Sequence, residues 1–328
     1  MPRCSCRLLI FFCFAAGGAG AQPDVPEKTP PATANPAAPP AAPGATPQAD
    51  QSWQIHLDRP ARPGQRYSLS STGTQDRHTS TSSLGQPTET TTEHLEINYA
   101  AIHEIKAADQ QGRPTEILIR LDRLTTNDGS GPVDQFQAGT VITAKANGNQ
   151  TRYQLDRTEL DGTLADALNL AGAKLPSTRE PSEDTVFLNH TTRRPGDRWT
   201  ADPKHLADAI AATTSFLIDP VTSTGEIHLD GPVTENGIPA LATTTTFRIA
   251  PIALSDAPDQ TLAQSSISST TVRIHPVDPA LPLLKETLRT DMKIMRRAKS
   301  GPEPTGSETT FHREVTRRYL PLAADASK

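Results

Sequence analysis

The sequence predicts a mainly β protein of antiparallel sheets, built as an internally duplicated β module with two short helices between the copies.

 Three observations support this prediction. Threonine and serine dominate the chain after residue 50, and these residue types favour pleated, half-buried strands over helix interiors. Apolar side chains alternate with polar ones in several segments. A short turn motif also occurs twice along the chain.

Alternation with a period of two residues marks the expected strands, because successive side chains of a strand point to opposite faces. Four segments show apolar positions on one face, at Leu95, Ile97 and Tyr99; at Ile117, Ile119 and Leu121; at Phe247 and Ile249; and at Phe311, Val315 and Tyr319. These positions are therefore the expected core of the sheet.

The segment 284–297 fits two patterns. As a strand, it places apolar side chains on one face and basic ones on the other, with Leu284, Leu288, Met292 and Ile294 opposite Lys285, Arg289, Lys293 and Arg297. The same segment also fits a helix with Leu284, Leu288, Met292 and Met295 on one face. Residues 301–306 (Gly-Pro-Glu-Pro-Thr-Gly) predict a turn before the last strand.

Two short helices are expected in the middle of the chain. Leu164, Leu168 and Ala171 recur at helical spacing. Asp202 is a typical N-cap and precedes Pro203, a residue favoured at the first helical position, so a second helix is expected through residue 210.

The turn motif Arg-Pro-Gly-polar-Arg-aromatic occurs at 62–67 and again at 194–199. A second motif, amide-Gly-x-Pro, follows each copy at 111–114 and 236–239. Pro-Gly is suited to start a strand and Gly-x-Pro to turn a hairpin. We therefore interpret the chain as a β module duplicated once, with the two aromatic residues as equivalent buried anchors. The alternative is a chance similarity in a chain rich in turns.

These motifs carry a resemblance. Pro-Gly-Asp-x-Trp at 195–199, after a helical linker and a Pro-Gly-x-x-Tyr strand opening at 63–67, resembles a group of uncharacterised exported bacterial β proteins known only as a domain of unknown function. The resemblance covers residues 53–320 and brings no catalytic residues. By architecture alone, a large antiparallel sheet with a helical cover is also similar to the periplasmic lipoprotein-carrier fold, which implies little about function.

The chain divides into four parts: a signal peptide (1–21), a disordered Pro/Ala-rich linker (22–50), a β-rich body (51–320, with halves at 53–160 and 186–320) and a flexible tail (321–328). Arg3 and Arg7 precede a nine-residue apolar stretch and the small residues Ala19-Gly20-Ala21, which is typical of a secretory signal. The stretch is short for a membrane anchor, which needs about 20 residues. We therefore expect export to a periplasmic or extracellular location, and no transmembrane span in the mature chain.

The linker holds nine prolines and eight alanines in 29 residues. It has few large apolar side chains to offset the entropy cost of ordering, so it is expected to be a polyproline-like spacer or a passive tail.

Composition excludes several chemistries. All three cysteines (Cys4, Cys6 and Cys13) lie in the signal segment, so the mature chain is expected to have no disulfide, thiolate nucleophile or cysteine-bound metal. Removal of Arg3 and Arg7 takes the net charge from −5 to −7, which argues against nucleic acid as a partner.

A search for sites leads to no catalytic, cofactor-binding or metal-binding residues. The nine histidines are scattered without zinc spacing, and the serine-hydrolase elbow and the phosphate-binding glycine loop are missing. The sequence leaves open a hydrolase site made of two carboxylates that lie outside any known motif. A basic cluster could dock on an anionic surface or form a solvated face; it comprises Lys293, Arg296, Arg297, Lys299, Arg313, Arg317 and Arg318.

The sequence thus favours an exported, non-enzymatic envelope protein that acts by binding or as a structural module, with no cofactor. Its partner is expected to be a cell-envelope protein or an apolar ligand. One alternative is a periplasmic carrier of a lipid or other apolar ligand, which predicts a cavity lined by Ile117, Ile119, Phe247 and Ile249. The other is a hydrolase, which predicts two carboxylates converging in a cleft.

Overall fold

A computed structural model describes residues 51–322 except 84–87, 161, 178–179, 189–190, 215, 255–256, 263–264 and 298–304. The expected signal peptide and linker lie outside the described residues, as do most of the turn at 301–306 and most of the tail. Within the described part the protein is mainly β and antiparallel, as predicted. The last strand runs to Leu322, two residues into the expected tail.

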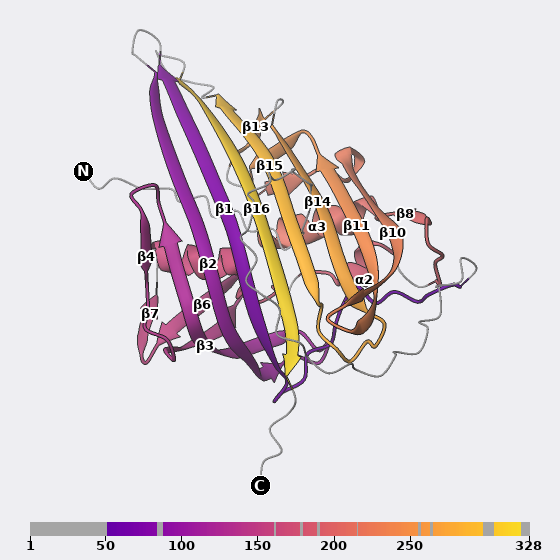
Figure 1. Ribbon diagram of the computed structural model, residues 1–328. Coiled ribbons are helices and arrows are strands. Elements are labelled where there is room, and N and C mark those ends of the chain that lie inside the picture. The colour runs from indigo at the N-terminus through magenta and orange to yellow at the C-terminus, as the bar shows by residue number, and fades with distance from the viewer. Residues whose placement is uncertain are drawn as a thin grey trace, which may run out of the picture.

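Thirteen strands of the described chain form one antiparallel sheet in the order β7-β6-β5-β3-β2-β1-β16-β15-β14-β11-β10-β8, with β4 beside β3 (Figure 1). Their bounds are β1 (Arg66–Ser83), β2 (Glu89–Ala108), β3 (Pro114–Asn127), β4 (Pro132–Asp134), β5 (Val141–Asn147), β6 (Gln150–Leu155), β7 (Thr158–Leu160), β8 (Arg198–Thr200), β10 (Ser223–Glu235), β11 (Ile238–Ile249), β14 (Ser266–Pro276), β15 (Lys285–Arg297) and β16 (Thr305–Leu322). A small second sheet contains β9 (Phe216–Ile218), β12 (Ile252–Leu254) and β13 (Ala257–Leu262).

The large sheet consists of two meanders that meet where β1 pairs with β16. One meander runs outward from β1 to β7, and the other runs inward from β8 to β16. The pairing extends from Arg66 opposite Leu322 to Ser83 opposite Thr305. Gly73 permits close packing here, since a Cβ at this position would lie 2.8 Å from Cγ2 of Val315. We call this junction the seam.

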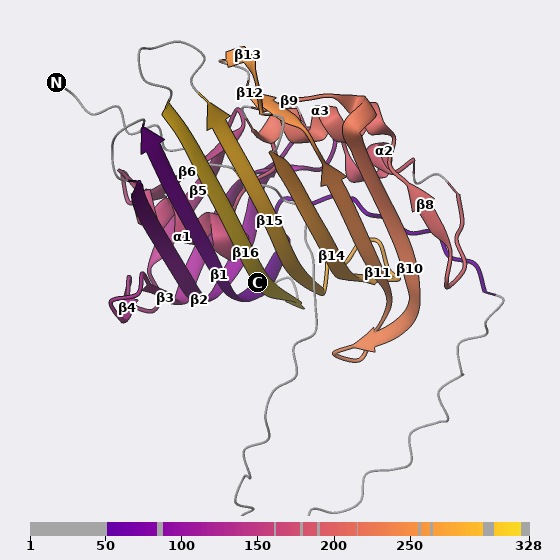
Figure 2. The same ribbon diagram turned by 90° about the horizontal axis from the view of Figure 1, so that it is seen from above.

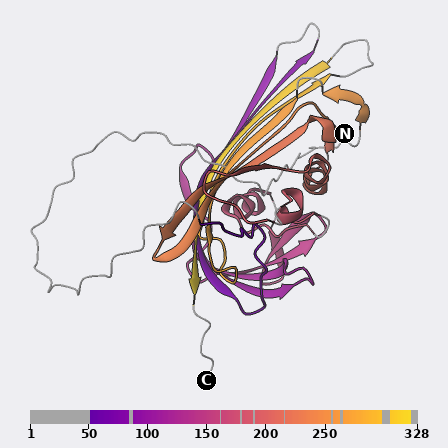
Figure 3. The same ribbon diagram turned by 90° about the vertical axis from the view of Figure 1, so that its right-hand side faces the viewer.

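Helices cover one face of the sheet, which we call the inner face (Figures 2 and 3). The helices are α1 (Gly162–Ala171), α2 (Glu183–Val186) and α3 (Pro203–Thr213), followed by a 3-10 turn at Pro220–Thr222. One apolar cluster joins α1 to the first meander, and a second joins α2 and α3 to the second meander. The core is therefore divided into two parts on either side of the molecule.

Both predicted helices are present, and Asp202 caps α3 by accepting a 2.8 Å hydrogen bond from the amide of His205. The placement of both helices between the copies was wrong for α3, which follows β8 inside the second half. The helical alternative for 284–297 was also wrong. Residues 285–297 form β15, and its apolar side chains Leu288, Met292 and Ile294 are buried in the two apolar clusters on the inner face.

The two Arg-Pro-Gly turns form the same hydrogen bonds. The amides of Gly64 and Gly196 each donate over 2.8 Å, to the carbonyls of Ile105 and Leu229 respectively. Both glycines have positive φ angles, +85° and +90°, which glycine adopts without strain. The likeness of the turns is local, and duplication of the whole module stays a prediction.

The two expected aromatic anchors differ in burial. Trp199 is buried at 7% exposure in the core cluster of the second meander. Tyr67 is half-buried and packs against the core cluster of the first meander. Tyr67 is therefore less buried than Trp199, because it lines a cavity.

Candidate binding cavity at the seam

A cavity of about 380 Å³ lies on the inner face at the seam, between the two apolar clusters. Its sheet side carries Tyr67 of β1, Ile105 of β2, and residues of β14, β15 and β16. Residues 57–61 and the linker between α1 and α2 enclose it from the other side. The volume is within the range of about 300–1,000 Å³ typical of small-molecule sites. We call it the seam cavity.

A polar row crosses the sheet beside the cavity, with Arg317, Glu286 and Arg273 opposite one another on β16, β15 and β14. Glu286 accepts from Arg317 and, over 3.0 Å, from Nε of Arg273. Arg317 also donates to the carbonyl of Leu170 at the end of α1, over 3.0 Å. The row therefore connects the sheet to the helical cover.

A second carboxylate reaches Arg273 from outside the sheet. Glu183, the first residue of α2, pairs with the Nη1 end of its guanidinium. Burial raises the pKa of Glu183 to about 7 despite the opposing attraction of Arg273. Burial acts in the same direction on Glu286, but Arg317 and Arg273 together outweigh it and hold the pKa of that carboxyl below its usual value. The two carboxyls on one guanidinium thus differ in how readily they give up their charge.

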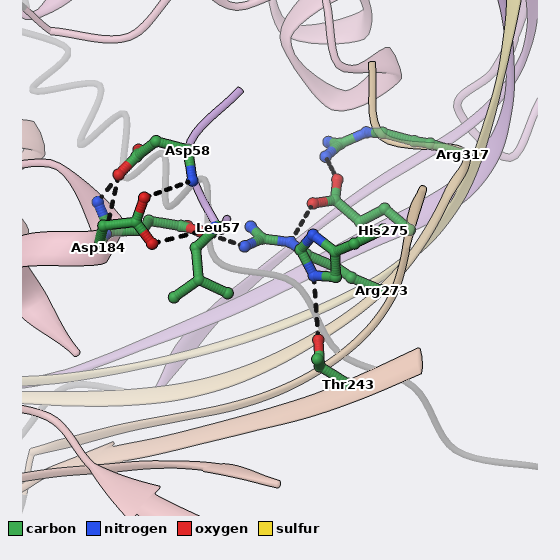
Figure 4. Close-up of polar contacts among 9 residues, drawn as sticks. Leu57, Asp58, Asp184, Thr243, Arg273, His275 and Arg317 are labelled. Atoms are coloured by element: carbon green, nitrogen blue, oxygen red, sulfur yellow. Dashed lines mark hydrogen bonds and ion pairs between the residues drawn. The ribbon is translucent and has the colours of Figure 1, made fainter. Parts of the chain in front are cut away.

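The segment 51–65, which we call the strap, crosses the inner face and closes part of the cavity. Asp58 accepts from the amides of Glu183 and Asp184, over 3.2 and 2.8 Å. Asp184 in turn accepts from the amides of Leu57 and Asp58, over 3.0 and 3.5 Å (Figure 4). Each carboxylate thereby binds the backbone of the other's segment.

Further contacts fix the strap at both ends. Trp53 and Arg193 exchange two backbone hydrogen bonds of 2.7 Å. Arg59 donates over 2.7 Å to the carbonyl of Pro276 at the end of β14 and over 2.9 Å to that of Asp278 in the following turn. The amide of Ala61 donates over 2.7 Å to Gly112 in the turn between β2 and β3. The strap therefore contacts both meanders, although its residues show no periodic pattern that predicts these contacts.

Two histidines are buried near this region. The ring of His103 lies between the hydroxyls of Tyr99 and Tyr67, at 2.6 and 3.3 Å. Burial lowers the pKa of His103 to about 3, so the ring is neutral at physiological pH. His275 contacts Thr243 over 3.1 Å, and burial lowers its pKa well below the usual value (Figure 4).

The charge of the cavity lining is opposite to that of the chain. Six basic residues line the cavity: Arg59, Arg113, Lys174, Arg273, Arg313 and Arg317. Four acidic residues do so: Asp58, Glu180, Glu183 and Glu286. The chain as a whole carries a net charge of −5. The lining is therefore locally positive, which favours an anionic group in a ligand.

The cavity differs from the one that the carrier alternative predicts. Ile117, Ile119, Phe247 and Ile249 are all buried in the apolar clusters and do not line it. The expectation of an unfilled apolar sheet face was wrong at these four positions, because the helices and the strap pack onto them.

The basic cluster divides between the two faces of the sheet. Lys293 pairs over 2.7 Å with Glu308 on the outer face, whereas Arg313 and Arg317 are buried at 4% and 7% exposure on the inner face. The sequence contains a signal of this burial. Arg313 and Arg317 are an even number of positions from Phe311 and Val315, so they lie on the same face of the strand as these apolar side chains. A charged residue at an inward position indicates a buried polar site.

No group of three or more histidine, cysteine or carboxylate side chains is placed to hold a metal ion in the described ranges. None of the helices among these residues is long and apolar enough to cross a membrane.

No family model and no curated protein sequence matches the chain, so the resemblance to the exported bacterial group gains no support from a family model. Similar solved structures include one titled for lipid–protein interactions in lipovitellin, at 6% identity and a TM-score of 0.32, covering 81% of this chain. The chain spans 26% of the length of that lipovitellin chain.

Two further structures are more distant. LprF from Mycobacterium bovis has a TM-score of 0.17 at 7% identity, with 72% of this chain and 83% of LprF covered. The toluene transporter TodX of P. putida has a TM-score of 0.18 at 8% identity, with 80% of this chain and 91% of TodX covered. Similarities at these scores carry no argument about function.

Proposed function

We propose that this chain is an exported, non-enzymatic binding protein that holds one small amphiphilic or apolar ligand in the seam cavity. The observation that carries the proposal is the cavity itself, which lies between two packed apolar clusters and is lined both by apolar side chains, such as Ile105 and Leu283, and by converging charged ones, such as Arg273. A concave site of this volume with converging polar groups suits a small ligand that has apolar and polar parts.

The size of the cavity favours a small ligand over a whole lipid. The apolar sheet positions on either side are already covered by helices, so a long acyl chain would require these helices to separate from the sheet. A ligand within about 380 Å³ requires no such rearrangement.

Export is supported by the sequence alone. Residues 1–21 have the charge, the apolar stretch and the small-residue cleavage pattern of a secretory signal, and they contain all three cysteines. We therefore propose a periplasmic or extracellular protein of the cell envelope.

A hydrolase is the second candidate, and one observation favours it. Glu183 and Glu286 converge in the cavity with their pKa values moved in opposite directions, as in acid–base pairs. Binding is the better-supported function because both carboxylates contact Arg273, which occupies the space between them.

The test fills the cavity with a side chain. Leu283 lines the cavity, whereas Val277, in the same connection between β14 and β15, is 40% exposed. We expect the neutral fluorophore N-phenyl-1-naphthylamine to bind the full chain, Leu283→Trp to weaken this binding at least tenfold, and Val277→Trp to leave it within twofold. Equal binding by all three proteins would place the probe elsewhere and refute the proposed site.

A further inference from the structure

Arg273 contacts two carboxylates that are held in different ways. Glu286 lies opposite Arg273 on the neighbouring strand and is also held by Arg317. Glu183 belongs to a helix of only four residues in the connection between the two meanders. Withdrawal of Glu286 from Arg273 would disturb the central sheet, whereas withdrawal of Glu183 requires only a shift of its short helix.

Both members of the Glu183–Arg273 pair line the seam cavity. A ligand inside the cavity therefore has access to the Nη1 end of the guanidinium, where Glu183 is bound. Burial makes the charge of Glu183 costly, as its raised pKa indicates, so removal of this carboxylate from Arg273 costs less than removal of Glu286.

We propose that the ligand carries an anionic group, a carboxylate or a phosphate, that replaces Glu183 on Arg273 while its apolar part occupies the seam cavity. Glu183 then acts as an internal substitute for the ligand and keeps Arg273 paired when the cavity is empty. This inference rests on the proposed function, because it specifies the ligand class of the same cavity. It requires no covalent step.

The replacement model makes a prediction that differs from direct recognition by Glu183. If Glu183 competes with the ligand, its conversion to a neutral amide should strengthen anion binding, since glutamine holds a guanidinium less firmly than a carboxylate does. If Glu183 itself contacts the ligand, the same change should weaken binding.

The test compares two ten-carbon probes, decanoate and decanol, by titration calorimetry on the full chain. The length is chosen because about 380 Å³ corresponds to roughly a dozen water-sized volumes of about 30 Å³. Glu226→Gln is the control for the loss of one carboxylate, because Glu226 pairs with Arg198 at an exposed position and does not line the cavity. Circular dichroism confirms that each variant is folded.

We expect decanoate to bind at least tenfold more tightly than decanol. Glu183→Gln should tighten decanoate binding about tenfold and leave decanol within twofold, and Glu226→Gln should change neither by more than twofold. Equal affinities for the two probes, or weaker decanoate binding by Glu183→Gln, would overturn the replacement model alone. No binding of either probe would overturn the proposed function together with it.

Arg273→Gln provides a second measurement. This variant should bind decanoate no more tightly than decanol, provided that its spectrum matches that of the parent. A decanoate preference that persists in folded Arg273→Gln would show that another cation binds the anion, which contradicts the proposal.

Discussion

Asp58 and Asp184 exchange hydrogen bonds, each carboxylate accepting from backbone amides of the other's segment. Asp184→Ala removes the acceptor for the amides of Leu57 and Asp58. We expect a loss of about 1–3 kcal/mol in the free energy of unfolding, the usual cost of leaving buried donors unpaired. Hydrogen exchange at Leu57 should become faster.

Asp208→Ala is the control for that change, because Asp208 pairs with Lys204 at the surface of α3 and such pairs contribute about 0–1 kcal/mol. Unchanged exchange at Leu57 in Asp184→Ala would show that the strap is held by its other contacts.

The buried His103 gives stability a specific dependence on pH. Its pKa in the folded protein is about 3, below the usual value of about 6.5, so unfolding takes up a proton between these values. The stabilisation is therefore present above pH 6.5 and is lost as pH falls, by about 1.4 kcal/mol per unit from this site. Glutamine does not titrate in this range, so His103→Gln should lack this part of the pH dependence of stability.

The measurement is urea unfolding of both proteins at pH 7.5 and pH 4.5. The advantage of the parent over His103→Gln should shrink by roughly 2–3 kcal/mol at the lower pH. A difference between the two proteins that is the same at both pH values would contradict the assignment.

Gly172 and Arg317 are packed too closely for any other residue at position 172. Gly172 has φ = +97°, and a Cβ would lie 2.6 Å from Nε of Arg317. Gly196 has a similar angle of +90° but no heavy atom within 4 Å of that position. Alanine at either position would incur the backbone strain of a positive φ angle, which costs about 1–2 kcal/mol.

Only Gly172→Ala also displaces Arg317, so it should be less stable than Gly196→Ala by about 1–3 kcal/mol, a typical cost of overpacking. Chemical denaturation of the two variants measures the difference. Equal losses would mean that the guanidinium shifts at little cost.

Glu286 holds two buried arginines, so its loss should be costly. Glu286→Gln weakens the pairing of Arg273 and Arg317, and we expect a loss of about 3–5 kcal/mol, as for a broken buried pair. Glu226→Gln, at an exposed pair with Arg198, should cost less than about 1 kcal/mol. Similar values for the two variants, from thermal or urea unfolding, would argue against this role.

Alternation along the strands predicted the fold class and most of the core. Ile97, Ile119 and Val315 are buried, as the alternation along their strands predicted. The pairing of β1 with β16 could not be predicted in this way, because alternation assigns faces and carries no information on which distant strands meet. The seam and its cavity depend on this pairing.

The candidate site was missed for a related reason. Arg273, Glu286 and Arg317 lie on three consecutive strands and become neighbours only through the register of those strands, which alternation does not specify. Each of the three lies at a position of its strand that alternation assigns to the inner face, and this could have indicated a buried polar site. The strap offered none, because its contacts run through backbone groups and single side chains such as Asp58.

The neighbouring positions of β1 and β16 also set an order of events in folding. About 250 residues separate the paired residues Arg66 and Leu322, and such distant pairings close late. Each meander can assemble from local hairpins, and the polar row forms within the second meander. The cavity, which also needs Tyr67 of β1 and Ile105 of β2, exists only after β16 has joined β1. A chain that crosses a membrane before it folds would complete this step on the far side. A ligand that binds only the completed cavity is therefore expected to stabilise the joined sheet there and to slow its reopening.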